Sequence, residues 1–135
     1  MMNFSCSDLI EVIRSNSADP RLISRNINLT WEIIEMFPNY NWEWYHLSMN
    51  PNITWEIVQA NRDKPWDSSI SANPNITWEI LQTFKDDPLW HLCYISWNPN
   101  ITPKIVYENR DLNWDWDSLT VQMGISSSVN HIREN

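Results

Sequence analysis

Hydrophobic and polar positions recur along this chain in a 24-residue pattern. The string Asn-Pro-Asn-Ile-Thr starts at Asn50, Asn73 and Asn98, and a weaker copy, Asn-Ile-Asn-Leu-Thr, starts at Asn26. Four tryptophans keep a constant spacing of 24 residues, and the frame recovers wherever a copy is one residue short or long. Self-similarity at a fixed period is the sequence signature of a repeat protein. The closing threonines are Thr30, Thr54, Thr77 and Thr102, and the spaced tryptophans are Trp42, Trp66, Trp90 and Trp114.

Each repeat is expected to open with a short helix directly after its threonine. Threonine is a favourable N-cap residue, and the glutamate that follows in Thr-Trp-Glu-Ile favours the positive end of the helix dipole. In the fourth copy Pro103 takes the first helical position, where proline is favoured. Apolar residues then recur at helical spacing, as at Ile57 and Val58.

A second helix is expected to begin after an Asn or Asp three residues before each spaced tryptophan. Both residue types are favourable N-caps, and Pro65 and Pro88 stand in the expected first turn. The helix should end before Asn-Pro, since asparagine tolerates the left-handed conformation and proline disfavours a helical residue before it. The expected caps are Asn39, Asp63, Asp87 and Asp111, and the later apolar positions are Leu47, Ile70, Ile95 and Leu119.

Helices this short are not stable alone, so they must stack on their neighbours. We therefore expect an all-α fold, an α-solenoid of two-helix repeats with roughly eleven short helices, some of them 3₁₀. Strands are disfavoured because the apolar residues do not alternate and prolines recur in each unit. The chain is expected to form a single repeat domain over residues 1–135, with a capping unit at 1–25, four good units over 26–121 and a degenerate unit at 122–135.

Composition narrows the classes of function. The formal charge is −8, from 9 Lys and Arg against 17 Asp and Glu, whereas nucleic-acid and anionic-membrane surfaces need clustered cations. No apolar run is long enough to span a bilayer, and residues 1–8 carry no secretion signal, so we expect neither a membrane partner nor secretion. The single glycine, Gly124, argues against phosphate-binding loops and nucleophile elbows.

The repeat resembles the tryptophan-repeat gene family of large DNA viruses, such as giant amoebal viruses and insect poxviruses. The resemblance rests on Asn-Pro-Asn-Ile-Thr-Trp-Glu-Ile units followed by Pro-Trp-Asp or Asn-Trp-Glu-Trp, and it covers about residues 26–121. It implies a viral protein without an assigned enzymatic activity, located in the host cytoplasm or the virus factory. The unit is also similar to leucine-rich-repeat-variant proteins, which can hold an iron–sulfur cluster on clustered N-terminal cysteines. Only Cys6 lies near the N-terminus here, so no cofactor is expected.

The ten tryptophans divide into two groups by their repeat positions. Seven stand where the repeat requires a tryptophan, and burying an aromatic side chain contributes about 2–3 kcal/mol, so we assign these seven to the core. The other three stand at variable positions: Trp44 aligns with Ser68 and Leu92, and Trp97 aligns with Ala72. Exposed aromatics are preferred interface anchors. The seven core assignments are Trp31, Trp42, Trp55, Trp66, Trp78, Trp90 and Trp114.

The first functional hypothesis is a non-enzymatic scaffold that binds a host or viral protein. A solenoid presents many equivalent surface positions that can be tuned to a partner. The negative charge favours a basic patch on that partner. The candidate partner-binding residues are Trp44, Tyr45, Trp97 and Trp116, together with the acidic Glu43, Asp67, Asp115 and Asp117.

The alternative hypothesis is a structural, self-assembling viral component, such as a homodimer or a virion or virus-factory protein. The open end of a solenoid exposes an apolar face unless a terminal unit caps it. The degraded units at both ends of this sequence favour capping, and therefore the first hypothesis.

No catalytic or metal-binding residues are assigned. The three histidines, His46, His91 and His131, share no repeat position and show no metal-ligand spacing. Cys93 lies within an expected helix and is interpreted as a small buried hydrophobic residue rather than a nucleophile. Cys6 and Cys93 alone provide neither a disulfide framework nor a cysteine metal site.

Several asparagines match the glycosylation pattern Asn-x-Ser/Thr, but they recur because the repeat recurs. Asparagine side chains commonly bond the backbone within turns. We therefore expect a ladder of asparagine–backbone hydrogen bonds along one edge of the array. The residues concerned are Asn28, Asn52, Asn75 and Asn100, with Asn3 as a further match.

Overall fold

The computed structural model describes residues 4–123, and over that range the chain is helical without strands. The all-α prediction is thus confirmed. The described residues form nine α-helices and one 3₁₀ helix. The last of the roughly eleven expected helices would belong to the unit at 122–135, which lies almost wholly outside the described residues, as do Asn3, Gly124 and His131. The chain divides into two compact units, residues 1–67 and 68–135, which we call unit 1 and unit 2.

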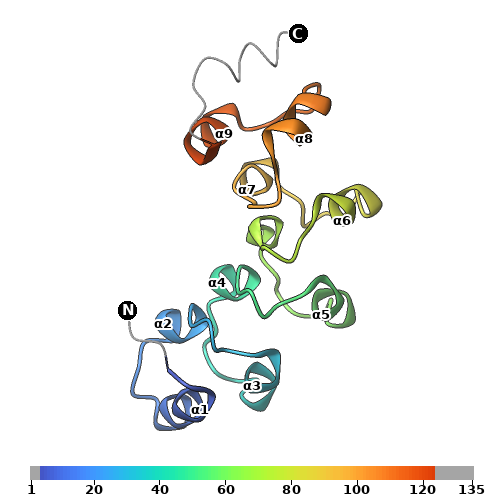
Figure 1. Ribbon diagram of the computed structural model, residues 1–135. Helices are drawn as coiled ribbons and strands as arrows, with labels where there is room; N and C mark the ends of the chain where they lie inside the picture. Colours follow the sequence, from blue (N-terminus) through green and yellow to red (C-terminus); the bar gives the residue numbers. More distant parts are fainter. Residues whose placement is uncertain (1–3, 124–135) are drawn as a thin grey trace. The chain divides into compact units, whose positions relative to one another are not determined.

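Unit 1 is built from five short helices in two rows. In Figure 1, α3 and α5 follow one another in one row, and α2 and α4 lie in the other. Direct packing of α2 on α4 holds the second row together. The bounds are α1 Cys6–Ser15, α2 Pro20–Ser24, α3 Trp31–Met36, α4 Trp44–Ser48 and α5 Trp55–Ala60.

The described part of unit 2 repeats the same plan. In Figure 1, α6 and α8 form one row, and the 3₁₀ helix η1, α7 and α9 form the other. Here η1 packs directly on α7. The bounds are η1 Ser68–Ala72, α6 Trp78–Thr83, α7 Leu92–Ile95, α8 Pro103–Glu108 and α9 Trp116–Met123.

The threonine caps form as predicted. The Oγ1 atoms of Thr30, Thr54, Thr77 and Thr102 each accept a hydrogen bond from the backbone N–H three residues later. The helix begins at the next residue in every case, and in α8 that residue is Pro103. Since such a cap contributes about 1 kcal/mol, the sequence itself fixes where these four helices start.

The second helix of each repeat begins later than predicted. Asn39, Asp63, Asp87 and Asp111 do not cap it, because each lies about five residues before the first helical residue. The spaced tryptophan between them lies in a turn and not in the helix. The observed helices begin two residues after that tryptophan, at Trp44, Ser68, Leu92 and Trp116.

Hydrogen bonds of the indole rings explain this shift. In each repeat the indole N–H donates to a backbone carbonyl five or six residues earlier, at the end of the first helix. The indole thereby satisfies a carbonyl that the helix end leaves without an intrahelical donor. The segment between the first helix and the tryptophan is therefore non-helical, and the second helix begins only after the tryptophan. The pairs are Trp42–Phe37, Trp66–Asn61, Trp90–Phe84 and Trp114–Asn109, at 2.7–2.9 Å.

The Asn-Pro stops also differ from the prediction. Among the described non-glycine residues only Asn16 has a positive φ, so the asparagines before proline are not left-handed. Instead, the Oδ1 of Asn50 accepts the backbone N–H of Asn52, while its carbonyl accepts the N–H of Ile53. This is a β-turn with asparagine first and proline second, both favoured at those positions. Asn26, Asn73 and Asn98 make the same pair of bonds in their repeats.

Asparagine side chains join successive repeats within each unit, as the predicted ladder requires. In unit 1 the Nδ2 of Asn28 donates to the Phe4 carbonyl at 2.7 Å, and that of Asn52 donates to the Ile27 and Leu29 carbonyls. In unit 2 the Nδ2 of Asn100 donates to carbonyls of the preceding repeat in the same way. These amides are therefore occupied in structural bonds.

Buried serines form a second set of bonds between repeats. The Oγ of Ser24 accepts the backbone N–H of Glu43, and the Oγ of Ser48 accepts that of Asp67, both at 3.0 Å. In unit 2 the Oγ of Ser71 accepts the N–H of His91. All three serines are fully buried, so each hydroxyl is required where it lies.

The core of each unit contains one residue from each turn and one from each second helix, together with first-helix residues such as Ile34, Val58 and Leu81. The isoleucine or leucine of the Asn-Pro-Asn-Ile-Thr string and the matching apolar residue of the second helix are almost completely inaccessible. The buried aliphatic positions are Leu29, Ile53, Ile76 and Ile101, and Leu47, Ile70, Ile95 and Leu119.

Among the described residues, no helix combines the length and the apolar character needed to cross a membrane.

Candidate functional site

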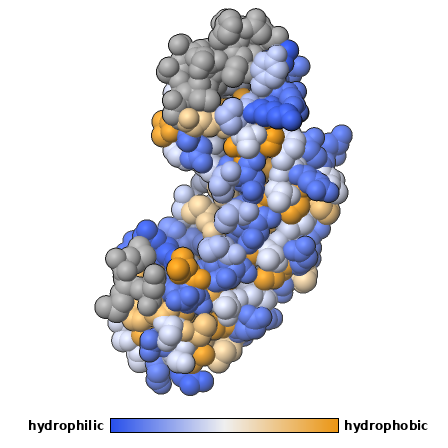
Figure 2. All heavy atoms as spheres, in the orientation of Figure 1, coloured by the Kyte–Doolittle hydropathy of each residue, from blue (hydrophilic) through white to orange (hydrophobic). Residues whose placement is uncertain are grey.

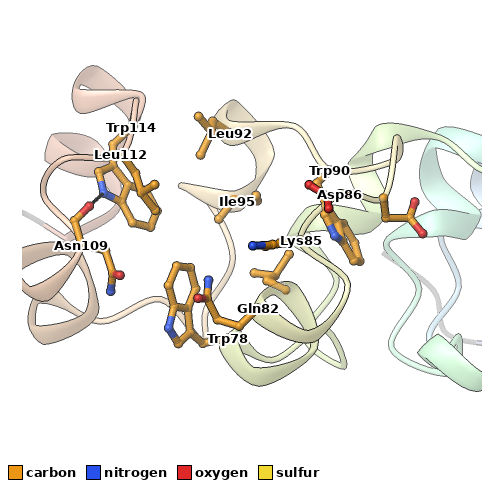
Figure 3. Close-up of a pocket in the computed structure, with 12 residues that line it drawn as sticks. Trp78, Gln82, Lys85, Asp86, Trp90, Leu92, Ile95, Asn109, Leu112 and Trp114 are labelled. Carbon is orange, nitrogen blue, oxygen red and sulfur yellow. Dashed lines mark hydrogen bonds between the residues drawn. The ribbon is translucent and has the colours of Figure 1, made fainter.

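Unit 2 carries an open cavity of about 440 Å³ between two successive repeats. Figure 3 shows how its walls are assembled: Trp78 comes from α6, Leu92 and Ile95 come from α7, and Leu112 and Trp114 come from the loop before α9. The Trp90 ring closes another part of the wall. The lining is therefore mainly apolar and aromatic, as in sites that bind ligand side chains.

Two tryptophans from different repeats face one another in this wall. The rings of Trp78 and Trp114 lie 6.0 Å apart between centroids and are nearly parallel, at 28°. Trp114 is fixed by its indole bond to the Asn109 carbonyl at 2.9 Å. Asn109 is fixed in turn, because its Nδ2 donates to the Ile105 carbonyl. The wall is thus held by hydrogen bonds to the helix ends rather than by contact alone.

Polar groups line the rim of the cavity. Lys85, Asp86 and Asp87 follow α6 and are its three charged lining residues. The Oδ1 of Asp87 accepts the backbone N–H of Leu89 at 3.0 Å, which fixes the loop. Gln82 and Asn109 add two amide groups. The arrangement can hold an apolar side chain while offering hydrogen-bond partners and charge around it.

Unit 1 has an equivalent cavity, but it holds only about 170 Å³. Trp31 and Trp42 correspond to Trp78 and Trp90, and the Trp31 ring lies 5.5 Å from Trp66, the counterpart of Trp114. Both cavities are therefore formed by the same repeat positions.

The two cavities differ at the first residue of the second helix. The first residue of α4 is Trp44, whose ring lies 5.1 Å from Trp66 in an edge-on arrangement. The first residue of α7, at the same repeat position, is Leu92. The second ring system in unit 1 occupies space that the smaller leucine leaves open in unit 2. The repeat thus contains a site that the chain fills once with its own side chain.

The repeat tryptophans do not all lie in the core. Five are at most 9% exposed, whereas Trp78 and Trp90 are half-buried, and both of these line the cavity of unit 2. Trp78 differs in this from its counterpart Trp31, which is 8% exposed. The five buried tryptophans are Trp31, Trp42, Trp55, Trp66 and Trp114.

The aromatic contact candidates fall into both units. Trp97 and Tyr45 are exposed, at 40% and 38%. Trp44 and Trp116 are half-buried, and Trp44 has a packing role against Trp66. Other exposed apolar side chains are scattered, and Figure 2 shows small hydrophobic patches among hydrophilic residues. In the described residues these are Leu22, Ile27, Met36, Tyr107, Leu112 and Val121.

Three of the acidic candidates, Glu43, Asp67 and Asp115, occupy equivalent repeat positions, whereas Asp117 lies two positions later in its repeat. Glu43 and Asp67 are half-buried in unit 1, where their backbone N–H groups bond to serines. In unit 2, Asp117 is exposed, and Asp115 accepts the backbone N–H of Ser118 at 3.1 Å. That bond, with further ones from the Ser118 hydroxyl and the Cys93 thiol, lowers the pKa of Asp115 below its ordinary value. Asp115 is thus ionised at neutral pH and engaged within the fold.

The environment of Cys93 in unit 2 does not activate its thiol. The carboxylate of Asp115, which accepts a hydrogen bond from Cys93, together with partial burial raises the pKa of the Cys93 thiol. Since the thiolate is the reactive form, Cys93 lacks the activation of a nucleophile. This agrees with its interpretation as a packing residue, although it is half-buried rather than buried.

The described histidines lie in different surroundings. Burial lowers the pKa of His46, with Arg25 and Arg21 acting in the same direction and Glu43 opposing them. The Nδ1 of His91 accepts the Cys93 backbone N–H and caps α7. In residues 4–123, no three His, Cys, Asp or Glu side chains are grouped so that they could hold a metal ion.

The cavity was not predicted from the sequence. Trp78 and Trp90 were assigned to the core because their repeat positions carry tryptophan elsewhere. The informative position was that of Leu92, where a small residue replaces the bulky Trp44.

No family model, no curated protein and no solved structure matches the chain. Conclusions on its function therefore rest on its own residues and their geometry.

Proposed function

We propose that the chain is a non-enzymatic α-solenoid of four 24-residue repeats with degraded end units, and that it binds a protein partner through the cavity of unit 2. The partner would insert an apolar side chain beside Leu92, against the exposed parts of Trp78 and Trp90. In this role the repeat provides the frame, and Leu92, which is smaller than Trp44 at the same repeat position, leaves room for the partner side chain.

The observation that carries the proposal is the incomplete burial of two repeat tryptophans at one cavity. Trp78 and Trp90 are half-buried where their counterparts Trp31 and Trp42 are buried. Exposed aromatic surface in a concave, pre-formed site is typical of an anchor for a partner side chain. The hydrogen bond that fixes Trp114 holds this part of the cavity wall in one conformation, so little ordering of the wall would be needed on binding.

The resemblance to the tryptophan-repeat gene family suggests the setting of this interaction. On that basis the partner would be a host or viral protein in the host cytoplasm or the virus factory. The negative net charge of −8 supports a partner with a basic surface around the inserted side chain.

A random peptide library selected on the immobilised chain tests the proposal. We expect enriched peptides that bind the wild type and lose at least about tenfold in affinity on Leu92→Trp, because the new indole fills the cavity. The matched control is Trp97→Ala, which removes an exposed tryptophan outside the cavity and should leave the affinity unchanged.

Two results would overturn the proposal. One is the failure of any peptide to enrich, and the other is binding that Leu92→Trp leaves intact while Trp97→Ala abolishes it. Light scattering during size exclusion provides a separate check. A monomer at all concentrations is expected, whereas a stable dimer that buries the cavity would favour the self-assembly hypothesis.

A further inference from the structure

The cavity of unit 1 shows which side chain suits this repeat site. Trp31, Trp42 and Trp44 line it at the positions of Trp78, Trp90 and Leu92. The indole of Trp44 also lies against Trp66. The contact is edge-on, with an angle of 86° between the rings, which is a favoured arrangement for aromatic pairs. Unit 1 is therefore an internal example of the site with an indole in place.

We infer that the open cavity of unit 2 binds a tryptophan side chain of the partner, and that a basic residue stands next to that tryptophan. This inference rests on the proposed function and adds the chemistry of its ligand. The incoming indole would occupy the space beside Leu92 and pack against Trp78 and Trp90, the two half-buried tryptophans of the lining.

The size of the cavity agrees with an aromatic ligand. The volume falls from about 440 Å³ in unit 2 to about 170 Å³ in unit 1, where the Trp44 indole is already present. Two further exchanges contribute: Pro38 stands at the position of Lys85, and Lys64 at that of Leu112. Each cavity thus keeps one lysine, although at different repeat positions.

The charges on the rim favour an aromatic ligand with a cationic neighbour. The Lys85 ammonium can lie against the electron-rich face of an aromatic ring, a gain that an aliphatic side chain does not offer. The carboxylates of Asp86 and Asp87 outnumber this lysine, and the same three residues line a shallow depression that adjoins the cavity. A lysine or arginine next to the inserted tryptophan would lie close to these carboxylates.

Small peptide analogues test the inference without a known partner. The probes are N-acetyl-tryptophanamide and N-acetyl-leucinamide, titrated into the full chain while the indole N–H signals of Trp78, Trp90 and Trp114 are followed by NMR. We expect the tryptophan probe to bind about fivefold more tightly than the leucine probe. Its effect should be lost in Leu92→Trp, and Trp97→Ala should leave it unchanged.

Charge is tested with two dipeptides, N-acetyl-Trp-Lys-amide and N-acetyl-Trp-Glu-amide. The lysine form should bind more tightly, and its advantage should shrink in Asp86→Asn and at high salt.

The inference is overturned if the leucine probe binds as tightly as the tryptophan probe, if neither moves the indole signals, or if Leu92→Trp leaves the response intact. Equal binding of the two dipeptides overturns the requirement for a basic neighbour. The proposed function is judged separately, because library peptides that lose affinity on Leu92→Trp but carry no tryptophan would uphold it while contradicting this inference.

Discussion

Replacing Trp66 by alanine should lower the free energy of unfolding by about 3–5 kcal/mol. The side chain is 9% exposed, and its ring packs against Trp31 at 5.5 Å and Trp44 at 5.1 Å. The substitution also removes the indole donor of the Asn61 carbonyl, which is bonded at 2.8 Å. Denaturant unfolding followed by circular dichroism measures the loss.

Two further variants separate the causes of this loss. Trp66→Phe retains an aromatic ring but not the indole donor, so it should cost about 1–2 kcal/mol. Trp97→Ala removes a tryptophan that is 40% exposed and should cost below about 1 kcal/mol. If Trp97→Ala were as damaging as Trp66→Ala, the distinction between frame and surface tryptophans would be wrong.

Replacing Asn98 by alanine should cost about 3 kcal/mol, because the side chain is fully buried and serves several backbone groups. Its Nδ2 donates to the carbonyls of Ser71 at 2.8 Å and Ile76 at 2.9 Å, and its Oδ1 accepts the N–H of Asn100. The substitution removes these bonds, although the Ile76 carbonyl keeps its bond from the Nδ2 of Asn100. Asn98→Asp should cost still more, since a carboxylate would face the carbonyl oxygens.

The exposed Asn113 provides the matched control for the Asn98 variants. Asn113→Ala should change the free energy of unfolding by less than about 0.5 kcal/mol, as is usual for surface sites. Thermal unfolding of the variants side by side measures the effect. Equal losses for Asn98→Ala and Asn113→Ala would show that the asparagine bonds between repeats contribute little to stability.

Local signals in the sequence predicted the first helix of each repeat well. The capping preference of Thr54 and the first-turn preference of Pro103 act within a few residues of the helix start, so no distant contact is needed to place it. The all-α class followed in the same way from helical spacing and recurring prolines.

The second helices were placed less well because a longer-range bond decides their start. Asp63 is a good cap by residue type, but the Trp66 indole bonds back to Asn61 and keeps the intervening chain in a turn. Similarly, Asn98 had been expected to end a helix through its own backbone conformation. Its main contribution is a set of bonds to carbonyls more than twenty residues earlier, which no local rule predicts.

The aromatic character of the candidate site was predicted from the sequence, but its location was not. The sequence indicated an interaction surface with aromatic anchors, and it drew attention to Trp44 because its repeat position varies. The structure places Trp44 against Trp66, and the open space occurs where the same position carries Leu92. Whether a variable tryptophan is a ligand-binding residue or a filled cavity depends on three-dimensional contacts between repeats, which alignment of the repeats alone does not provide.

The equivalence of the two cavities, one filled and one open, is tested most directly by exchanging their variable residues. Thermal unfolding of Leu92→Trp and Trp44→Leu measures it without any partner. Leu92→Trp should stabilise the chain by about 1 kcal/mol, because the indole finds a pre-formed apolar space, and Trp44→Leu should destabilise it by about 1–3 kcal/mol, because it opens the same space in unit 1. A marked destabilisation by Leu92→Trp, or no loss in Trp44→Leu, would contradict the view that the cavity of unit 2 is shaped to receive an indole.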